Sequence, residues 1–67
     1  MPHVQITWVE GRTVEQKRRV VERFTKVLEE EAGANPDKTQ ITIVDVPLIN
    51  FATGGVLVAD SKPKPPR

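Results

Sequence analysis

Apolar and polar residues alternate along the first stretch of the chain, residues 2–9. One side carries Val4, Ile6 and Trp8, and the other carries His3, Gln5 and Thr7. A period of two is that of a β-strand with one apolar face. We therefore predict a strand over 2–9. Trp8 is expected in the core or at a subunit interface, because a large ring contributes most where it is buried.

A helical period follows a short turn around Gly11. Its apolar positions recur every three or four residues, at Val20, Val21, Phe24, Val27 and Leu28. Thr13 and Gln16 have the spacing of a capping box, and Gly33 suits the end of a helix. We predict a helix from Val14 to Ala32 with one apolar stripe. Its charged face holds two pairs in favourable i,i+4 order, Glu15 with Arg19 and Glu22 with Lys26.

A nearly continuous apolar run predicts a second strand over 38–46. Residues 41–44 are mostly β-branched, and so continuous a run is typical of a strand covered on both faces. Asn35 and Pro36 predict a short capped turn before it. Strand, helix and strand form one βαβ unit with parallel strands and a right-handed crossover. The predicted fold class is α/β, or α+β in some schemes.

The chain continues as a predicted hairpin. Pro47 ends the second strand, residues 48–53 are unusually apolar for a loop, and Gly54 and Gly55 turn the chain into a short last strand over 56–59. Two strands and one helix leave apolar surface uncovered, so we expect 48–58 to take part in self-association. One domain is predicted over 1–62, followed by a flexible Pro/Lys tail over 63–67.

The length of 67 residues also favours an oligomer. A chain this short buries only about 60% of its unfolded surface, so a single core is marginal. The sequence has no cysteine and one histidine, which argues against a disulfide or a protein-held metal as support. Self-association is the remaining route to stability.

Charge and aromatic content argue against two classes of partner. The formal net charge is +1, and aromatic residues make up 4% of the chain, too few for a surface on which nucleic-acid bases stack. No apolar run is long enough to span a membrane or to form a signal-peptide core. We expect a soluble, cytoplasmic protein that binds neither nucleic acid nor membrane.

The sequence contains no recognisable hydrolase triad, phosphate-binding loop or Cys/His cluster. The candidate chemistry lies at Pro2, which becomes a secondary amine at the chain start if Met1 is removed. Buried beside a cation, such an amine loses its proton near neutral pH. The simpler interpretation is that Pro2 only opens an edge strand. Arg12 likewise reads most simply as a solvated loop charge.

Taken together, these features resemble the 4-oxalocrotonate tautomerase family, from residue 2 to about residue 62. The residues that carry the resemblance are Pro2, Gln5 and Ile6, Glu10 to Arg12, Glu15 to Lys17, and Phe51 three residues before Gly54 and Gly55. The resemblance implies a homohexamer built as a trimer of dimers, each dimer having a four-stranded sheet with two helices on one face. It also implies an enol–keto tautomerase acting on a small 2-hydroxydienoate or enolpyruvate-type carboxylate, without metal or organic cofactor.

The resemblance assigns roles to individual residues. Pro2 would be the general base, Arg12 of a neighbouring subunit would bind the substrate carboxylate, and Phe51 would wall the pocket. Gln40 and Val9 are the further expected substrate contacts.

Gln40 stands where the family has a second arginine. A neutral amide donates a hydrogen bond without supplying charge, so a monocarboxylate substrate is favoured over 2-hydroxymuconate. Lys38, two residues away on the same predicted strand face, is a candidate substitute for that arginine.

Two alternatives stay open at this point. A hydratase or dehalogenase of the same superfamily would use a protonated proline and a carboxylate that activates water, but residues 50–56 contain no acid. A non-catalytic oligomeric binding protein on the same fold would fit a retained Met1 and the presence of Gln40.

Overall fold

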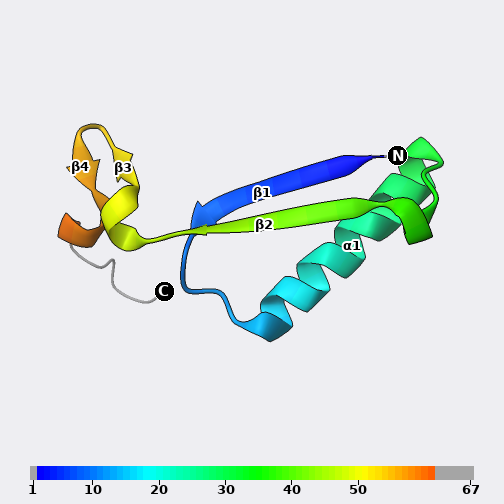
Figure 1. Cartoon of the computed structure of the whole chain (residues 1–67), viewed down its shortest axis with the longest axis horizontal. Coiled ribbons are helices and arrows are strands. Elements are labelled where there is room, and N and C mark those ends of the chain that lie inside the picture. The colour runs from blue at the N-terminus through cyan, green and yellow to red at the C-terminus, as the bar shows by residue number, and fades with distance from the viewer. Residues whose placement is uncertain (1, 62–67) are drawn as a thin grey trace.

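The computed structural model describes residues 2–61, and Figure 1 shows their arrangement. The elements in order are β1 (His3–Val9), α1 (Val14–Ala32), β2 (Gln40–Val46), β3 (Ala52–Thr53) and β4 (Val56–Leu57). Short 3₁₀ turns lie at Pro36–Lys38, Leu48–Asn50 and Val58–Asp60. Met1 and the predicted tail over 63–67 lie outside the described residues.

Strands β1 and β2 are parallel, as predicted for a βαβ unit. Their register runs from His3 opposite Gln40 to Val9 opposite Val46. The Gln40 N–H donates to the Pro2 carbonyl at 3.1 Å, which extends the pairing by one residue at the amino end. The register therefore places Pro2 beside the start of β2.

The start of β2 differs from the prediction, because Lys38 lies in the turn Pro36–Lys38 and not on the strand. Asn35 caps this turn, since its side-chain oxygen accepts from the Asp37 N–H at 2.9 Å and its carbonyl accepts from the Lys38 N–H at 3.0 Å. The cap and the fixed backbone angle of Pro36 hold the chain in a helical turn through Lys38. The prediction that Lys38 shares a strand face with Gln40 is wrong.

Helix α1 has the predicted bounds and caps. The Thr13 hydroxyl accepts from the Gln16 N–H at 3.1 Å, and the Gln16 side chain accepts from the Thr13 N–H at 2.9 Å. Gly33 ends the helix with φ +67°, a left-handed conformation that glycine adopts without strain.

The predicted ion pairs of the helix do not form within residues 2–61. Glu15 pairs instead with Arg18 at 3.1 Å, and no pair joins Glu22 to Lys26. An ion pair between exposed side chains stabilises a helix only slightly. The i,i+4 spacing alone therefore does not decide which pairs form.

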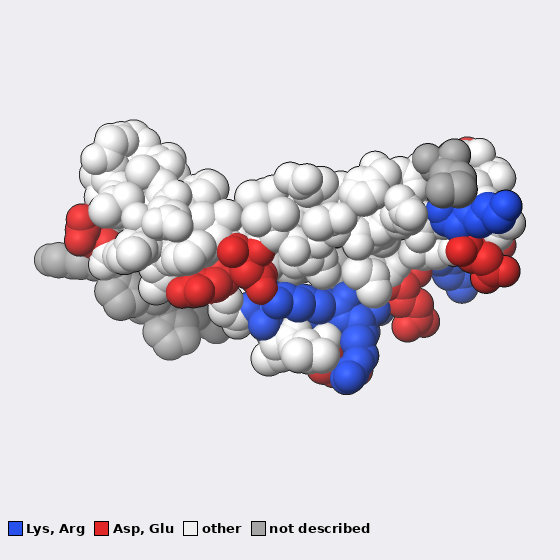
Figure 2. All heavy atoms as spheres, in the orientation of Figure 1, with Lys and Arg blue, Asp and Glu red and all other residues white. Residues whose placement is uncertain are grey.

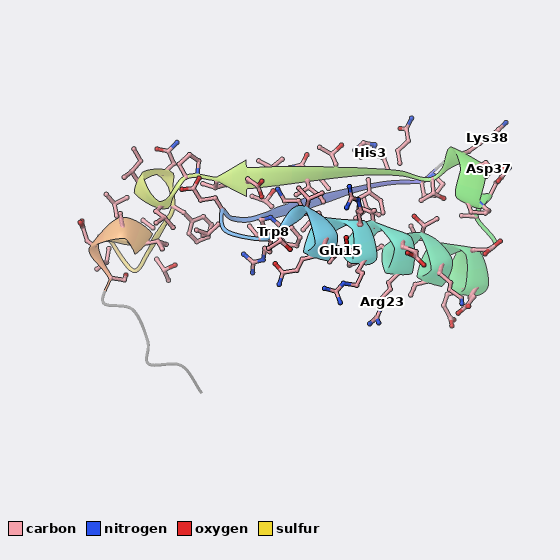
Figure 3. The ribbon with its side chains drawn as sticks, turned by 90° about the horizontal axis from the view of Figure 1, so that it is seen from below. His3, Trp8, Glu15, Arg23, Asp37 and Lys38 are labelled. Carbon is pink, nitrogen blue, oxygen red and sulfur yellow. The ribbon has the colours of Figure 1, made fainter. Side chains whose placement is uncertain are left out.

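Helix α1 covers one face of the two-stranded sheet. Figure 3 shows Trp8 on the helix side and His3 on the opposite side. The apolar side chains on the helix side of β1 and β2 are half-buried, whereas most of the opposite face is exposed, including Val44 at 36%. The prediction that β2 is covered on both faces is therefore wrong for a single chain. Figure 2 shows little charge along the strands, while charged side chains gather beside the helix.

The hairpin of β3 and β4 is antiparallel and turns at Gly54 and Gly55, as predicted. Both glycines have positive φ, +60° and +83°, as a tight hairpin turn of the primed type requires. The last strand is shorter than predicted, because the chain enters the 3₁₀ turn Val58–Asp60 directly after Leu57. In Figure 1 the hairpin projects beyond the sheet, at the end opposite the amino terminus.

The single chain has no closed core. No side chain among residues 2–61 is fully buried, and Phe24 and Val27 of the helix are 44% and 53% exposed. The Cα radius of gyration is 15.3 Å, against about 11 Å for a compact domain of this length. A subunit with this much uncovered apolar surface needs other copies, or another partner, to bury it.

Candidate functional site

Pro2 lies at the amino end of β1 and is half-buried. Its carbonyl accepts from the Gln40 N–H. Because proline has no backbone donor when it lies within a chain, the first position of a strand accommodates it without losing a ladder bond. Two of the predicted site residues, Pro2 and Gln40, thus lie side by side.

The Gln40 side chain belongs to a small polar cluster on the outer face of the sheet. Its Oε1 lies 3.3 Å from Nδ1 of His3, and Nε2 of His3 lies 3.0 Å from the Thr42 hydroxyl. The ring of His3 thus bridges Gln40 and Thr42, one contact from each ring nitrogen. Within residues 2–61 the Gln40 amide nitrogen has no side-chain partner, so it remains available as a donor.

Val9 and Arg12 lie together at the other end of β1. Gly11, with φ +131°, lets the chain turn sharply after the strand. The Arg12 Nη1 donates to the Val9 carbonyl at 2.9 Å, and the guanidinium carbon lies 4.7 Å from the centroid of the Trp8 ring. These two contacts hold Arg12 against its own strand. A freely solvated loop side chain would be less ordered.

A groove of about 330 Å³ runs between this end of β1 and the first half of α1. Its lining consists of Trp8, Arg12, Gln16, Arg19, Val20 and Arg23. Three guanidinium groups and no carboxylate line it, so its field favours an anion. Figure 3 shows Trp8 and Arg23 on this helix side of the sheet.

Trp8 has polar partners that sequence reasoning missed. Its indole N–H donates to Asp45 Oδ1 at 2.7 Å, and Lys17 of α1 forms an ion pair with the other Asp45 oxygen. The Lys17 ammonium first, and the Trp8 N–H second, lower the pKa of Asp45 below its usual value. The signal for this contact is the parallel register, which sets Trp8 opposite Asp45.

A single chain does not bring all the predicted site residues together. Pro2 and Arg12 lie beyond opposite ends of a seven-residue strand, which spans about 23 Å at the usual rise per residue. Phe51, 39% exposed, lies past the end of β2 with the hairpin. The structure therefore groups Pro2 with Gln40 and Val9 with Arg12, and Phe51 follows β2 at the end of the sheet opposite Pro2.

Two further structural tests concern membranes and metals. No helix in the described part of the chain is both long and apolar enough to cross a bilayer. Within the same residues, no three His, Cys, Asp or Glu side chains are grouped so that they could hold a metal ion.

The chain matches known proteins over most of its length. A 2-hydroxymuconate tautomerase of Bacillus subtilis is 37% identical over 90% of this chain and 97% of that protein. A 2-hydroxymuconate tautomerase of Comamonas testosteroni is 43% identical over 84% of this chain and 89% of that protein.

Two solved structures extend the similarity to the fold. A structure from work on the 4-oxalocrotonate tautomerase isozymes of Methylibium petroleiphilum superposes with a TM-score of 0.81, at 43% identity over 87% of this chain and 94% of that one. The crystal structure of a 4-oxalocrotonate tautomerase homologue superposes with a TM-score of 0.88, at 30% identity over 94% of this chain and 100% of that one. Residues 2–61 also match the family model described as "Tautomerase enzyme". The chain therefore belongs to the tautomerase family.

Proposed function

We propose that this protein is an enol–keto tautomerase of small 2-hydroxydienoate or enolpyruvate-type carboxylates, with Pro2, freed of Met1, as general base. The observation that carries the proposal is the family match, which begins at Pro2 and spans the described chain. Relatives named 2-hydroxymuconate tautomerase support the class of substrate. The cytoplasmic location expected from the sequence stays a prediction.

The active form is an assembly of several copies, a trimer of dimers. The exposed outer face of the sheet, the helix flank at Phe24 and Val27, and the projecting hairpin supply the surfaces that other copies would cover. Charge supports antiparallel packing of two α1 helices. The first half of the helix offers Arg19 and Arg23 to the groove, and its last turns carry Glu29, Glu30 and Glu31.

Sharing between copies follows from the separation of the two ends of β1. Because about 23 Å divides Pro2 from Arg12 in one chain, a pocket that contains both must take Arg12 from another copy. Phe51 follows β2 at the end of the sheet opposite Pro2, so it too would come from another copy than Pro2.

Within such a pocket Pro2 would move the proton. The neutral amine takes it from the enol hydroxyl and returns it to carbon, which leaves the conjugated ketone and regenerates the amine. Apolar walls from Phe51 and a nearby guanidinium from Arg12 both disfavour the ammonium form, so the amine is neutral at working pH.

Arg12 and Gln40 would divide the recognition of substrate. A guanidinium has five N–H donors, of which Val9 occupies one on Nη1, and the others suit a planar carboxylate. The Gln40 amide donates to the oxygen at the other end of the substrate, but without charge. This pairing favours a monocarboxylate such as phenylenolpyruvate over the dicarboxylate 2-hydroxymuconate.

The test uses protein whose lack of Met1 is verified by mass spectrometry, assayed for ketonisation of both compounds. Pro2→Ala should lower kcat by about 10²- to 10⁴-fold, the usual contribution of a general base. Pro47→Ala, which alters a proline outside the proposed pocket, is the matched control and should keep most of the activity. Equal rates for Pro2→Ala and the parent would refute the proposal.

Gln40 in place of an arginine also favours the second candidate, a non-catalytic binding protein on the same fold. Mass spectrometry of protein from its native host separates the two candidates. An intact Met1 would acylate the Pro2 nitrogen and would support the binding protein, because an amide nitrogen cannot act as a base.

A pH–rate profile separates the tautomerase from the hydratase alternative. The tautomerase needs neutral Pro2, so its rate rises as the amine loses its proton. The hydratase needs the protonated amine, so its rate falls over the same range.

A further inference from the structure

We propose that Trp8, anchored by Asp45, is a positioning residue that holds the Arg12 guanidinium ready for the substrate carboxylate. The role given to Arg12 rests on the function proposed above. The contacts that hold Arg12 in place do not depend on that function.

Arg12 is held at two points. Its Nη1 donates to the Val9 carbonyl at 2.9 Å, and its guanidinium carbon lies 4.7 Å from the Trp8 ring centroid. A cation at that distance is attracted to the electron-rich face of an indole, the strongest of the aromatic partners. Two contacts fix the direction of a side chain that would otherwise occupy many rotamers, so less entropy is lost when a ligand binds.

The Trp8 ring is itself fixed by three elements of the fold. Trp8 comes from β1, Asp45 from β2 and Lys17 from α1. The indole N–H donates to one Asp45 oxygen at 2.7 Å, and the Lys17 ammonium pairs with the other. This arrangement prevents rotation of the ring and thereby keeps its face beneath Arg12.

The same arrangement leaves the Arg12 charge free for a ligand. Asp45 bonds to the indole, and its two oxygens are engaged by Trp8 and Lys17, so Arg12 lowers the pKa of Asp45 only as the last of its causes and forms no ion pair with it within residues 2–61. No carboxylate lines the groove around Arg12. Trp8 thus orders the guanidinium without neutralising it, which a salt bridge to an acid would do.

The kinetic test compares substitutions in the parent free of Met1. Trp8→Leu removes the ring face and should raise KM about 3- to 10-fold with little change in kcat, because Arg12 binds substrate and transition state alike. Trp8→Phe keeps a ring but loses the indole N–H, so its KM should lie between that of the parent and that of Trp8→Leu.

Asp45 offers the corresponding test of the anchor. Asp45→Val removes the acceptor on a strand position and should also raise KM, while Asp45→Asn keeps an acceptor oxygen and should restore most of the parental value. Asp60→Asn, which removes a carboxylate outside this network, is the control. An unchanged KM in both Trp8→Leu and Asp45→Val would overturn the proposal.

Fluorescence tests the arrangement without relying on activity. Trp8 is the one tryptophan of the sequence, so the indole emission reports on this site alone. Arg12→Gln and Asp45→Val should each shift that emission, and Asp60→Asn should not. If the parent lacks tautomerase activity, the proposed function fails while the emission still decides whether Arg12 and Asp45 hold the ring. Emission that does not respond to either substitution would refute the positioning role.

Discussion

The two ends of β1 differ in the chemistry that they carry. The amino end brings together Pro2, His3 and Gln40, none of which is an aspartate, glutamate, lysine or arginine. The carboxyl end brings together Arg12 and the Lys17–Asp45 pair around Trp8. The seven-residue strand separates Pro2 from Arg12 within one chain, so a pocket that held both, as proposed above, would draw them from different copies.

The largest expected effect comes from preventing that assembly. Phe24→Asp places a charge on a helix side chain that is 44% exposed in the single chain and that would be covered by another copy. It should yield dissociated subunits in sedimentation experiments and remove activity altogether. Lys26→Asp introduces the same residue two positions away and is the control. An active, dissociated Phe24→Asp protein would show that one chain suffices.

The next effect separates binding from chemistry. Arg12→Ala should raise KM about 10- to 100-fold, since hydrogen bonds to a charged group contribute about 1.5–3 kcal/mol, while kcat changes much less. Steady-state kinetics with a monocarboxylate measures both values. An unchanged KM would contradict the proposal that Arg12 binds the substrate carboxylate.

A smaller effect concerns the neutral amino end. Gln40→Arg adds a charge beside Pro2 and should improve kcat/KM for 2-hydroxymuconate by about 10-fold, since charge-assisted hydrogen bonds are about twice as strong as neutral ones. Phenylenolpyruvate should gain less. Equal gains on both compounds would contradict the idea that Gln40 selects against a second carboxylate.

The smallest effect is a pH dependence at the carboxyl end. The pKa of Asp45 is lowered by Lys17 and then by Trp8. The ionised carboxylate therefore stabilises the fold above the ordinary pKa of aspartate, about 4, and this contribution is lost as the pH falls below that value. Urea unfolding should show Asp45→Asn less stable than the parent at pH 7 and nearly equal once the pH has fallen through the lowered pKa of folded Asp45. A difference that persists in acid would exclude the ion pair as its cause.

Local signals predicted the fold well. The alternation in β1, the caps of α1 at Thr13 and Gly33, and the glycine turn of the hairpin each depend on neighbours within a few residues. The errors also have physical causes. The length of an apolar run marks the start of a strand poorly, and the Asn35 cap holds Lys38 in the turn that precedes β2.

The sequence nominated residues for the candidate site but did not predict their contacts. Resemblance named Pro2, Arg12 and Phe51, whose roles stay predictions. The contact between Trp8 and Asp45 joins residues 37 positions apart and depends on strand register, which no local pattern specifies. The His3 contacts with Gln40 and Thr42 were missed for the same reason.

Subunit mixing tests the sharing of sites most directly. Pro2→Ala and Arg12→Ala proteins, each nearly inactive at low substrate concentration, are mixed in equal amounts, dissociated and reassembled. If each pocket takes Pro2 and Arg12 from different copies, random reassembly restores about one quarter of the pockets. Activity should therefore return to about that share of the parental value. A mixture that stays as inactive as its components would contradict the shared site.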